Sequence, residues 1–182
     1  MMKTKENNFG IKKDEDKNYR TINKFKLKKA ENNDYGIIAN MINQGAKAGE
    51  FNDNRDTNAE KLKDYIETNE YPNYEIFVFE KGNEIGGYLD ISHSKGVGEI
   101  LGIYVSENYR KQNLGTEMLN EIIKKFKKYG CYEIKADVYD SNNKSKAFFT
   151  KNGFEIVGSE IEEDTNRKLL FFSLDLSKFI RS

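Results

Sequence analysis

The sequence contains very little of several residues on which whole classes of protein depend. It has one cysteine, one proline and one histidine in 182 residues. A single cysteine excludes an internal disulfide, and one cysteine with one histidine cannot supply the ligands of a zinc site. No apolar run approaches the roughly 20 residues that cross a membrane, and the polar, charged start is unlike a secretory signal. We therefore expect a cytoplasmic protein that binds no metal and no membrane.

Several motifs of nucleotide-binding and hydrolytic proteins are also missing. The sequence has no Gly-x-x-x-x-Gly-Lys-Ser/Thr phosphate loop and no Gly-x-Gly-x-x-Gly dinucleotide loop. The single histidine, His93, stands between Ser92 and Ser94, and neither serine lies in a nucleophile elbow. The pattern thus gives no support to a nucleoside triphosphate site, a dinucleotide site or a serine hydrolase.

Charge is balanced overall but unevenly distributed along the chain. The formal net charge is zero, whereas residues 1–30 hold ten Lys and Arg against four Asp and Glu, a net +6 that leaves −6 elsewhere. A basic leader could contact nucleic acid or an acidic membrane surface. The first 20 residues lack apolar periodicity and interleaved aromatic residues, so we expect residues 1–22 to be a disordered, solvated leader without a nucleic-acid partner. Residues 23–182 are expected to form a single domain.

Hydrophobic periodicity predicts a mixed α/β chain. A first helix carries Ile37–Ile42, and a loop follows over residues 43–56. A second helix over 57–69 is expected to begin at Thr57 as N-cap, with Glu60 three residues later. Further segments have the alternation of strands or the 3.6-residue period of helices. Strands are predicted over 25–30, 74–80, 84–92, 99–105, 132–138, 154–158 and 169–176, and two more helices over 114–129 and 142–151.

One stretch predicts a chemical function. An apolar strand, 99–105, runs through a short polar loop directly into the amphipathic helix 114–129. The first amides of such a helix have no acceptor within it, and its dipole favours anions. The loop contains Asn113 and Gly115, two residues that adopt a positive φ readily. The sequence therefore predicts a phosphate-binding cradle at this helix N-terminus.

The cradle sequence resembles a known family. Arg110-Lys111-Gln112-Asn113-Leu114-Gly115 is similar to the Gln/Arg-x-x-Gly-x-Gly/Ala signature of the GNAT N-acetyltransferases, with Asn113 in place of the first glycine. Residues 142–154 resemble a second family motif, Asn-x-x-Ala-x-x-Phe-Tyr-x-Lys-x-Gly-Phe. The resemblance covers roughly residues 25–176. It implies the GNAT acyl-CoA N-acyltransferase fold, a central, mostly antiparallel sheet flanked by helices, and an enzyme that moves an acetyl group from acetyl-CoA to a primary amine.

The resemblance also implies which residues bind acetyl-CoA. Loop amides would hold the pyrophosphate, amides of the strand before the loop would hold the acetyl carbonyl, and the second motif would contact the rest of the coenzyme. The residues so implied are Ile103, Tyr104, Val105, Arg110, Lys111, Gln112, Asn113, Leu114, Gly115, Thr116, Asn142, Phe148, Phe149 and Lys151.

Acetyl transfer to an amine needs a base, an oxyanion site and a proton for the leaving thiolate. Glu99 stands eleven residues before Arg110, the spacing of the glutamate base in the histone-acetylating branch of the family. Its alternative role is a solvated charge or an ion pair at the strand end. Asp90 and Asp137 are weaker candidates for the base and better suited to binding a cationic acceptor. The histidine, His93, is expected at the surface.

The proton donor is less obvious from the sequence. Phe149 stands where many family members have a tyrosine near the coenzyme sulfur, and phenylalanine cannot donate a proton. Tyr104 or Tyr139 could serve instead, or the thiolate could take its proton from water or from the acceptor ammonium. Phe149 and Asn113 also leave open a second function, a catalytically degenerate acyl-CoA sensor. The acceptor and the oligomeric state are open, although the final strand and the segment after it could pair with a second copy as a homodimer.

Overall fold

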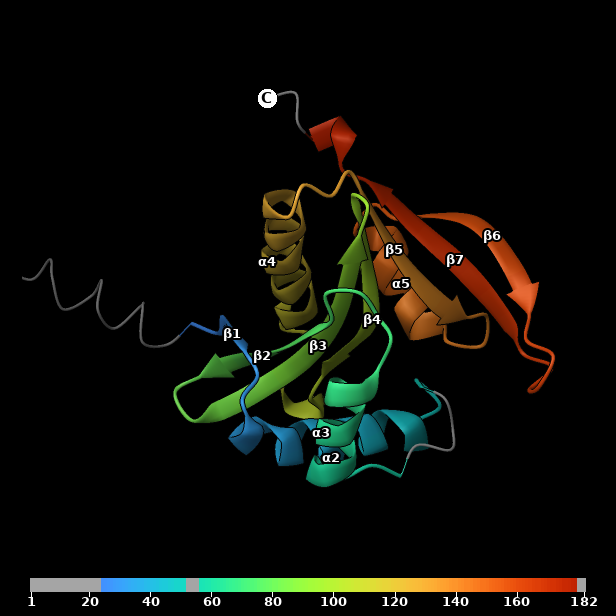
Figure 1. Ribbon diagram of the computed structural model, residues 1–182. Helices are drawn as coiled ribbons and strands as arrows, with labels where there is room; N and C mark the ends of the chain where they lie inside the picture. Colours follow the sequence, from blue (N-terminus) through green and yellow to red (C-terminus); the bar gives the residue numbers. More distant parts are fainter. Residues whose placement is uncertain (1–23, 52–55, 180–182) are drawn as a thin grey trace, which may run out of the picture.

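The computed structural model describes residues 24–51 and 56–179, and the expected leader, residues 1–22, lies outside them. The described residues form one seven-stranded sheet in the order β1-β2-β3-β4-β5-β7-β6 (Figure 1). Every neighbouring pair is antiparallel except β4 with β5. The strands are β1 Lys26–Lys29, β2 Glu75–Lys81, β3 Glu84–Ser94, β4 Val97–Val105, β5 Glu133–Tyr139, β6 Glu155–Ile161 and β7 Lys168–Asp175.

Helices cover both faces of this sheet. The α-helices are α2 Tyr35–Lys47, α3 Ala59–Thr68, α4 Leu114–Lys128 and α5 Asn143–Lys151. Three short 3-10 helices accompany them, η1 Asn32–Asp34, η2 Glu107–Tyr109 and η3 Ser177–Phe179. The order of the elements and the mixed, mostly antiparallel sheet confirm the fold class predicted from the sequence.

Two hydrophobic clusters fix the helices on opposite faces. On one face, α2 and α3 bury their apolar sides against alternate residues of β2, β3 and β4, which are Ile76, Val78, Tyr88 and Tyr104. On the other face, α4 and α5 pack on the strand side chains that point the opposite way. That larger cluster is centred on Phe77, Leu89, Ile91, Met118, Leu119, Ile122, Phe126, Ile134, Phe149 and Phe172. The period-2 alternation of the strands therefore decides which side chains face α2 and α3.

The parallel contact between β4 and β5 is short. Val97–Ile100 pairs with Glu133–Ala136, and we call these four residue pairs the seam. Pairing stops there, although β4 continues to Val105 and β5 to Tyr139. The two strands therefore separate beyond the seam and leave a gap between their C-terminal ends.

A β-bulge lies in β4 immediately beyond the seam. Asp90 of β3 pairs with Gly102 and Ile91 pairs with Ile100, so Leu101 is the extra residue. The bulge places Gly102 on the same face as Tyr104, toward α2, while Ile103 packs with the α4 side. A bulge of this kind bends the strand and disrupts the ladder locally.

Three expectations about individual elements were wrong. The first helix continues to Lys47, so the loop begins later than residue 43. Asn58, not Thr57, is the N-cap of α3, and its side chain accepts a hydrogen bond from the Lys61 amide at 2.9 Å. Both residues can cap a helix, and the pattern could not separate neighbours. The final strand, β7, lies between β5 and β6, so the edge strand is β6 instead.

Candidate active site

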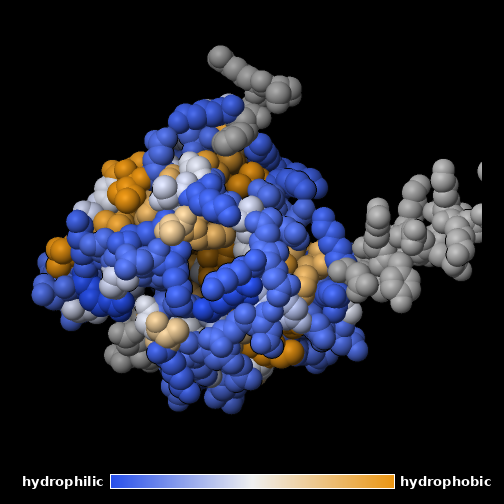
Figure 2. All heavy atoms as spheres, turned by 180° about the vertical axis from the view of Figure 1, so that it is seen from behind, coloured by the Kyte–Doolittle hydropathy of each residue, from blue (hydrophilic) through white to orange (hydrophobic). Residues whose placement is uncertain are grey.

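A large cavity opens at the gap between β4 and β5, and residues of both hydrophobic clusters line it. Its volume is about 1090 Å³, and residues of β3, β4, β5, β7 and both N-terminal helices line it. Seen from behind, the surface is mostly hydrophilic, and apolar side chains gather in a few patches, one of them at the floor of a hollow (Figure 2). Among the predicted site residues, the cavity is lined by Glu99, Ile103, Tyr139, Asn142 and Phe149.

The loop before α4 has the backbone geometry of an anion cradle. Asn113 is the N-cap of α4 and lies in the left-handed region, with φ 67° and ψ 5°. Lys111 also has a positive φ of 61°. The first hydrogen bond within the helix runs from the Glu117 amide to the Asn113 carbonyl at 3.1 Å. The helix therefore supplies no acceptor for the amides of the three residues that precede Glu117. These are the amides of Leu114, Gly115 and Thr116.

This cradle lies against both sides of the gap. A Cβ placed on Gly115 would lie 3.2 Å from the Phe148 ring of α5 and 3.5 Å from Cγ2 of Val105 in β4. Leu114 is buried in the α4 core, while Lys111 and Gln112 are exposed. The absence of a side chain at Gly115 thus allows α4, α5 and the end of β4 to approach closely. Lys151 lies exposed at the far end of α5.

The free side of β4 turns backbone groups into the gap. The Ser106 amide donates to the Gly86 carbonyl at 2.9 Å, so alternate residues of β4 point their polar groups away from β3. The Val105 carbonyl accordingly accepts a hydrogen bond from Arg110 Nε at 2.9 Å. By the same alternation, the amides of Ile103 and Val105 face the gap, where β5 no longer pairs with them.

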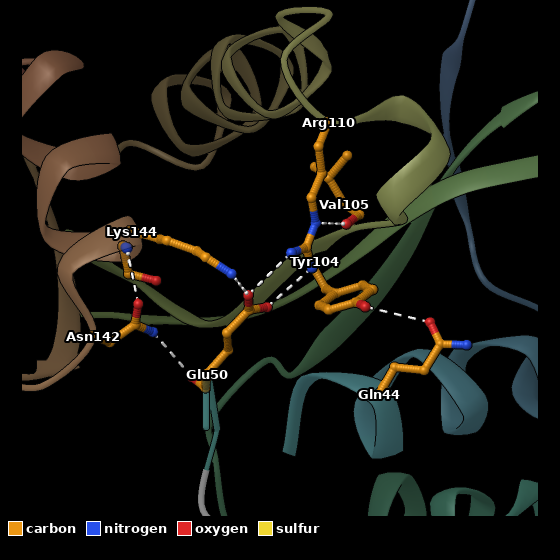
Figure 3. Close-up of polar contacts among 8 residues, drawn as sticks. Gln44, Glu50, Tyr104, Val105, Arg110, Asn142 and Lys144 are labelled. Atoms are coloured by element: carbon orange, nitrogen blue, oxygen red, sulfur yellow. Dashed lines mark hydrogen bonds and ion pairs between the residues drawn. The ribbon is translucent and has the colours of Figure 1, made fainter. Parts of the chain in front are cut away.

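A carboxylate spans the mouth of the gap. Glu50, just after α2, makes a two-pronged ion pair with Arg110, with both Nη–Oε distances 3.0 Å. Lys144 Nζ in α5 lies 2.8 Å from the same carboxylate, and the Asn142 side chain donates to the Glu50 carbonyl at 3.2 Å. Figure 3 shows Arg110, Lys144 and Asn142 converging on Glu50. Burial raises the pKa of Glu50, but hydrogen bonds and charges from Lys144 and Arg110 outweigh it and lower the pKa overall.

Two carboxylates face the cavity from the strands beside the seam. Glu99 lies within the seam, opposite Ser92 of β3 and Lys135 of β5. Asp137 follows two residues after Lys135, on the same face of β5. Partial desolvation and the charge of Glu99 raise the pKa of Asp137 above its usual range. The structure therefore brings the predicted base, Glu99, into the electrostatic neighbourhood of Asp137.

The three aromatic residues considered for the proton step have different surroundings. Tyr139 lines the cavity, and its hydroxyl donates to Glu162 at 2.9 Å. Tyr104 is 4% exposed, its hydroxyl donates to Gln44 at 3.3 Å, and burial is the main cause that raises its pKa (Figure 3). Phe149 borders the cavity with its ring packed among other phenylalanines. Of the two tyrosines, Tyr139 is the one at the cavity.

Sequence reasoning missed Glu50 and Lys144. Glu50 lies 60 residues before Arg110 and 94 before Lys144, and the polar loop around it gave no periodic signal.

His93 stacks on Tyr129, with ring centroids 4.3 Å apart, at the end of β3. Within 24–51 and 56–179, no group of three or more His, Cys, Asp or Glu side chains is arranged to hold a metal ion. In the same ranges no helix is long and apolar enough to cross a membrane.

The sequence matches a model of the acetyltransferase (GNAT) family over residues 45–154, more than half of its length and including both the cradle and α5. The chain belongs to the GNAT acetyltransferase family. It is therefore an acetyl-CoA-dependent acetyltransferase. No curated protein matches this acetyltransferase significantly in sequence.

Solved structures confirm the fold at low sequence identity. Spermidine N-acetyltransferase from Vibrio cholerae, solved with CoA and spermine, aligns with a TM-score of 0.74 at 15% identity and covers 87% of this chain and 99% of its own. Ribosomal-protein-alanine N-acetyltransferase from Brucella melitensis has a TM-score of 0.71 at 18% identity, covering 83% and 99%. The yncA protein of Salmonella typhimurium, solved with its cofactor acetyl-CoA, has a TM-score of 0.69 at 18% identity, covering 84% and 94%.

Proposed function

We propose that this acetyltransferase moves an acetyl group from acetyl-CoA directly to a primary amine in a ternary complex, with Glu99 as the base. The observation that carries the proposal is the meeting of three features at one gap. Beyond the four-residue seam, the α4 cradle, the free amides of β4 and a cavity lined by carboxylates all adjoin the space between β4 and β5. Coenzyme and acceptor can therefore approach the same point from opposite sides.

The residues of the gap suit the parts of acetyl-CoA. The amides of Leu114, Gly115 and Thr116, at the positive end of the α4 dipole, would hold the pyrophosphate. Asn142 and the aromatic side chains of Phe148 and Phe149 would flank the arm that leads to the thioester. When bound, acetyl-CoA supplies an activated acetyl group with a thiolate leaving group.

Amides and one carboxylate would then carry the chemistry. The amides of Ile103 and Val105 would stabilise the negative charge that develops on the acetyl carbonyl oxygen. Glu99 would take a proton from the acceptor ammonium, directly or through one water, so that the neutral nitrogen can attack the carbonyl carbon. A carbon–nitrogen bond forms and the carbon–sulfur bond breaks. Cys131 is buried between the end of α4 and the start of β5, so it offers no covalent alternative.

The departing thiolate needs a proton, and two sources fit the arrangement. The acceptor nitrogen must lose a second proton after it attacks, and that proton can neutralise the thiolate. Tyr139 lines the cavity and is the better placed of the two predicted tyrosines, although its hydroxyl now donates to Glu162. Tyr104 is buried, its hydroxyl donates to Gln44 of α2, and it does not line the cavity, so we assign it to packing.

Calorimetric titration with acetyl-CoA tests the cradle. We expect micromolar binding by the native chain and loss of binding in Gly115→Glu, which adds bulk beside Phe148 and a negative charge at the helix N-terminus. Gly36→Glu is the matched control, because a Cβ at Gly36 meets nothing within 4 Å. Thermal melting of each variant checks its folding. Equal binding by Gly115→Glu and the native chain would refute the cradle.

Release of free thiol from acetyl-CoA, screened over a library of amines, tests the transfer. We expect turnover with at least one primary amine and a large loss of kcat in Glu99→Gln, with coenzyme binding retained. Binding of acetyl-CoA without turnover of any amine would instead favour the second function, an acyl-CoA sensor that regulates a partner. The engagement of Tyr139 by Glu162 and the phenylalanine at position 149 are the observations that keep this second function in view.

Three further proposals concern the whole chain. We infer a single folded domain over residues 23–182, because all the described strands belong to one sheet. A reducing compartment such as the cytoplasm suits the single, unpaired cysteine. A homodimer would most readily form through β6, one of the two edge strands, which exposes Ile156, Val157 and Ile161. Light scattering of the purified chain tests the dimer.

A further inference from the structure

The acceptor side of the cavity is acidic. Six carboxylates and two lysines are the charged residues among its lining: Glu50, Asp56, Asp90, Glu99, Asp137 and Glu162, with Lys61 and Lys135. Glu50 is neutralised by Arg110 and Lys144. The remaining acidic side chains give the cavity a field that favours a cation over a neutral or anionic acceptor.

Asp90 is a cavity carboxylate that the fold holds in place. It lies on β3, facing the cavity, and its Oδ2 accepts a hydrogen bond from the Tyr74 hydroxyl at 3.1 Å. Its other oxygen lies over Gly102, the residue after the bulge, where a Cβ would be only 2.4 Å from Oδ1. The bulge and the glycine together leave room for a carboxylate at this point. Asp90 is thus held from two sides, by Tyr74 and by the shape of β4.

Aromatic side chains surround the same part of the cavity. Tyr65, Tyr71, Tyr74 and Tyr88 all line it. The Tyr65 and Tyr74 rings meet edge to face with centroids 5.8 Å apart, and Tyr71 lies 6.5 Å from Tyr74. Aromatic faces attract ammonium groups, and the attraction adds to that of a nearby carboxylate. An alkyl ammonium ion would find both partners here, with apolar ring surface for its methylene groups.

The separation between Asp90 and Glu99 sets the length of the acceptor. Both face the cavity, and Glu99 pairs with Ser92, two residues along β3 from Asp90. Two residues of a strand span about 7 Å. Asp90 pairs with Gly102, one residue before Ile103, so a short alkyl chain such as that of 1,4-diaminobutane would let one nitrogen bind Asp90 and the other reach the gap, on the side of Asp90 away from Tyr74 and within one water of Glu99.

From this arrangement, and resting on the proposed function, we infer that Asp90 selects acceptors that carry a second ammonium group, an aliphatic diamine or polyamine. One ammonium binds Asp90 among the tyrosines, while the other nitrogen reaches the gap beside the amides of Ile103 and Val105, where Glu99 takes its proton through one water and the nitrogen is acetylated. A monoamine of the same length lacks the first contact, so it should be a poorer substrate for the same chemistry.

Thiol release from acetyl-CoA with 1,4-diaminobutane and butylamine as paired acceptors tests the inference on the full chain. We expect kcat/KM to be at least about tenfold higher for the diamine, corresponding to about 1.4 kcal/mol of binding. Asp90→Asn should remove this preference, mainly by raising KM for the diamine, and leave butylamine turnover little changed. Asp64→Asn, on an exposed side of α3 outside the cavity lining, is the matched control.

A binding measurement makes the test independent of turnover. Calorimetric titration of 1,4-diaminobutane into the protein saturated with CoA should show binding that Asp90→Asn weakens and Asp64→Asn does not. Thermal melting confirms that each variant is folded. Equal kcat/KM for the two amines, or equal losses for both in Asp90→Asn, would overturn the inference while leaving the acetyltransferase function intact. Loss of all turnover with diamine binding retained would overturn the proposed mechanism instead.

Discussion

Replacing Glu50 by glutamine tests the ion-pair bridge across the mouth of the gap. The Glu50 carboxylate is 13% exposed and Arg110 is 28% exposed, so this pair is shielded from water more than most surface pairs. Lys144 is 73% exposed and adds little. A hydrogen bond to a charged group contributes about 1.5–3 kcal/mol. Because glutamine keeps one acceptor oxygen for Arg110, we expect the Glu50→Gln change to lower the free energy of unfolding by about 1–2 kcal/mol.

Thermal and urea unfolding at neutral pH measure this loss. For a chain of this size, a loss of 1 kcal/mol lowers Tm by about 2–4 °C, so we expect Glu50→Gln to melt about 3–6 °C lower. Lys144→Gln is the matched control, and its effect should stay within about 1 kcal/mol because that ammonium group is largely in water.

The pH dependence gives the sharper test. The folded-state pKa of Glu50 is lowered, so the stabilisation is complete above the pKa of an unfolded glutamate, ~4.3. It is lost as pH falls from there through the folded-state pKa, because protonation removes the charge that Arg110 and Lys144 bind. The difference in stability between the native chain and Glu50→Gln should therefore shrink below about pH 4. Equal stability at pH 7, or a difference that grows on acidification, would refute the bridge.

Four further predictions concern backbone fit and burial, and each is measured by urea unfolding unless stated. Asn113→Gly should keep or raise stability, and Asn113→Val should lower it by about 1–2 kcal/mol, because the residue lies at φ 67°. Gly98→Ala should cost about 1–3 kcal/mol, since the new Cβ would lie 2.5 Å from the Phe126 ring. Gly36→Ala should gain about 0.5–1 kcal/mol, as its Cβ meets nothing within 4 Å in a helix. Cys131 should resist a thiol reagent at neutral pH until urea unfolds the chain, because burial hides the thiol and raises its pKa.

Local patterns were sufficient to predict the elements, apart from some of their bounds, and the backbone conformation of Asn113. The order of strands and helices follows from periods of 2 and 3.6, which report the faces that each segment buries. The left-handed conformation at Asn113 was predictable because few residue types adopt it readily. The positive φ of Lys111 was not predictable, because lysine has no preference for that conformation.

Features that depend on contacts between distant segments could not be predicted from the sequence. The bridge joins Glu50 to partners 60 and 94 residues away; Arg110 and Lys144 lie in the two motifs, but nothing in the polar loop around Glu50 marks it as their partner. The insertion of β7 between β5 and β6 is a choice of sheet order, which strand patterns do not encode. The position of Asp90 under Tyr74 depends on a bulge that shifts the register by one residue, which strand periodicity does not encode.

The short seam has a consequence for the order of folding. Strands β2, β3 and β4 form a meander, and β6 and β7 form a hairpin, so their contacts join residues close in sequence. The seam begins with Val97 and Glu133, 36 residues apart, and α4 must form between them. Closing that longer loop costs more chain entropy than closing a hairpin, and the strand pairing that offsets the cost involves only four pairs of residues. We therefore expect the gap to be assembled late, when two preformed parts of the sheet join, so the enzyme acquires its coenzyme site only as folding ends.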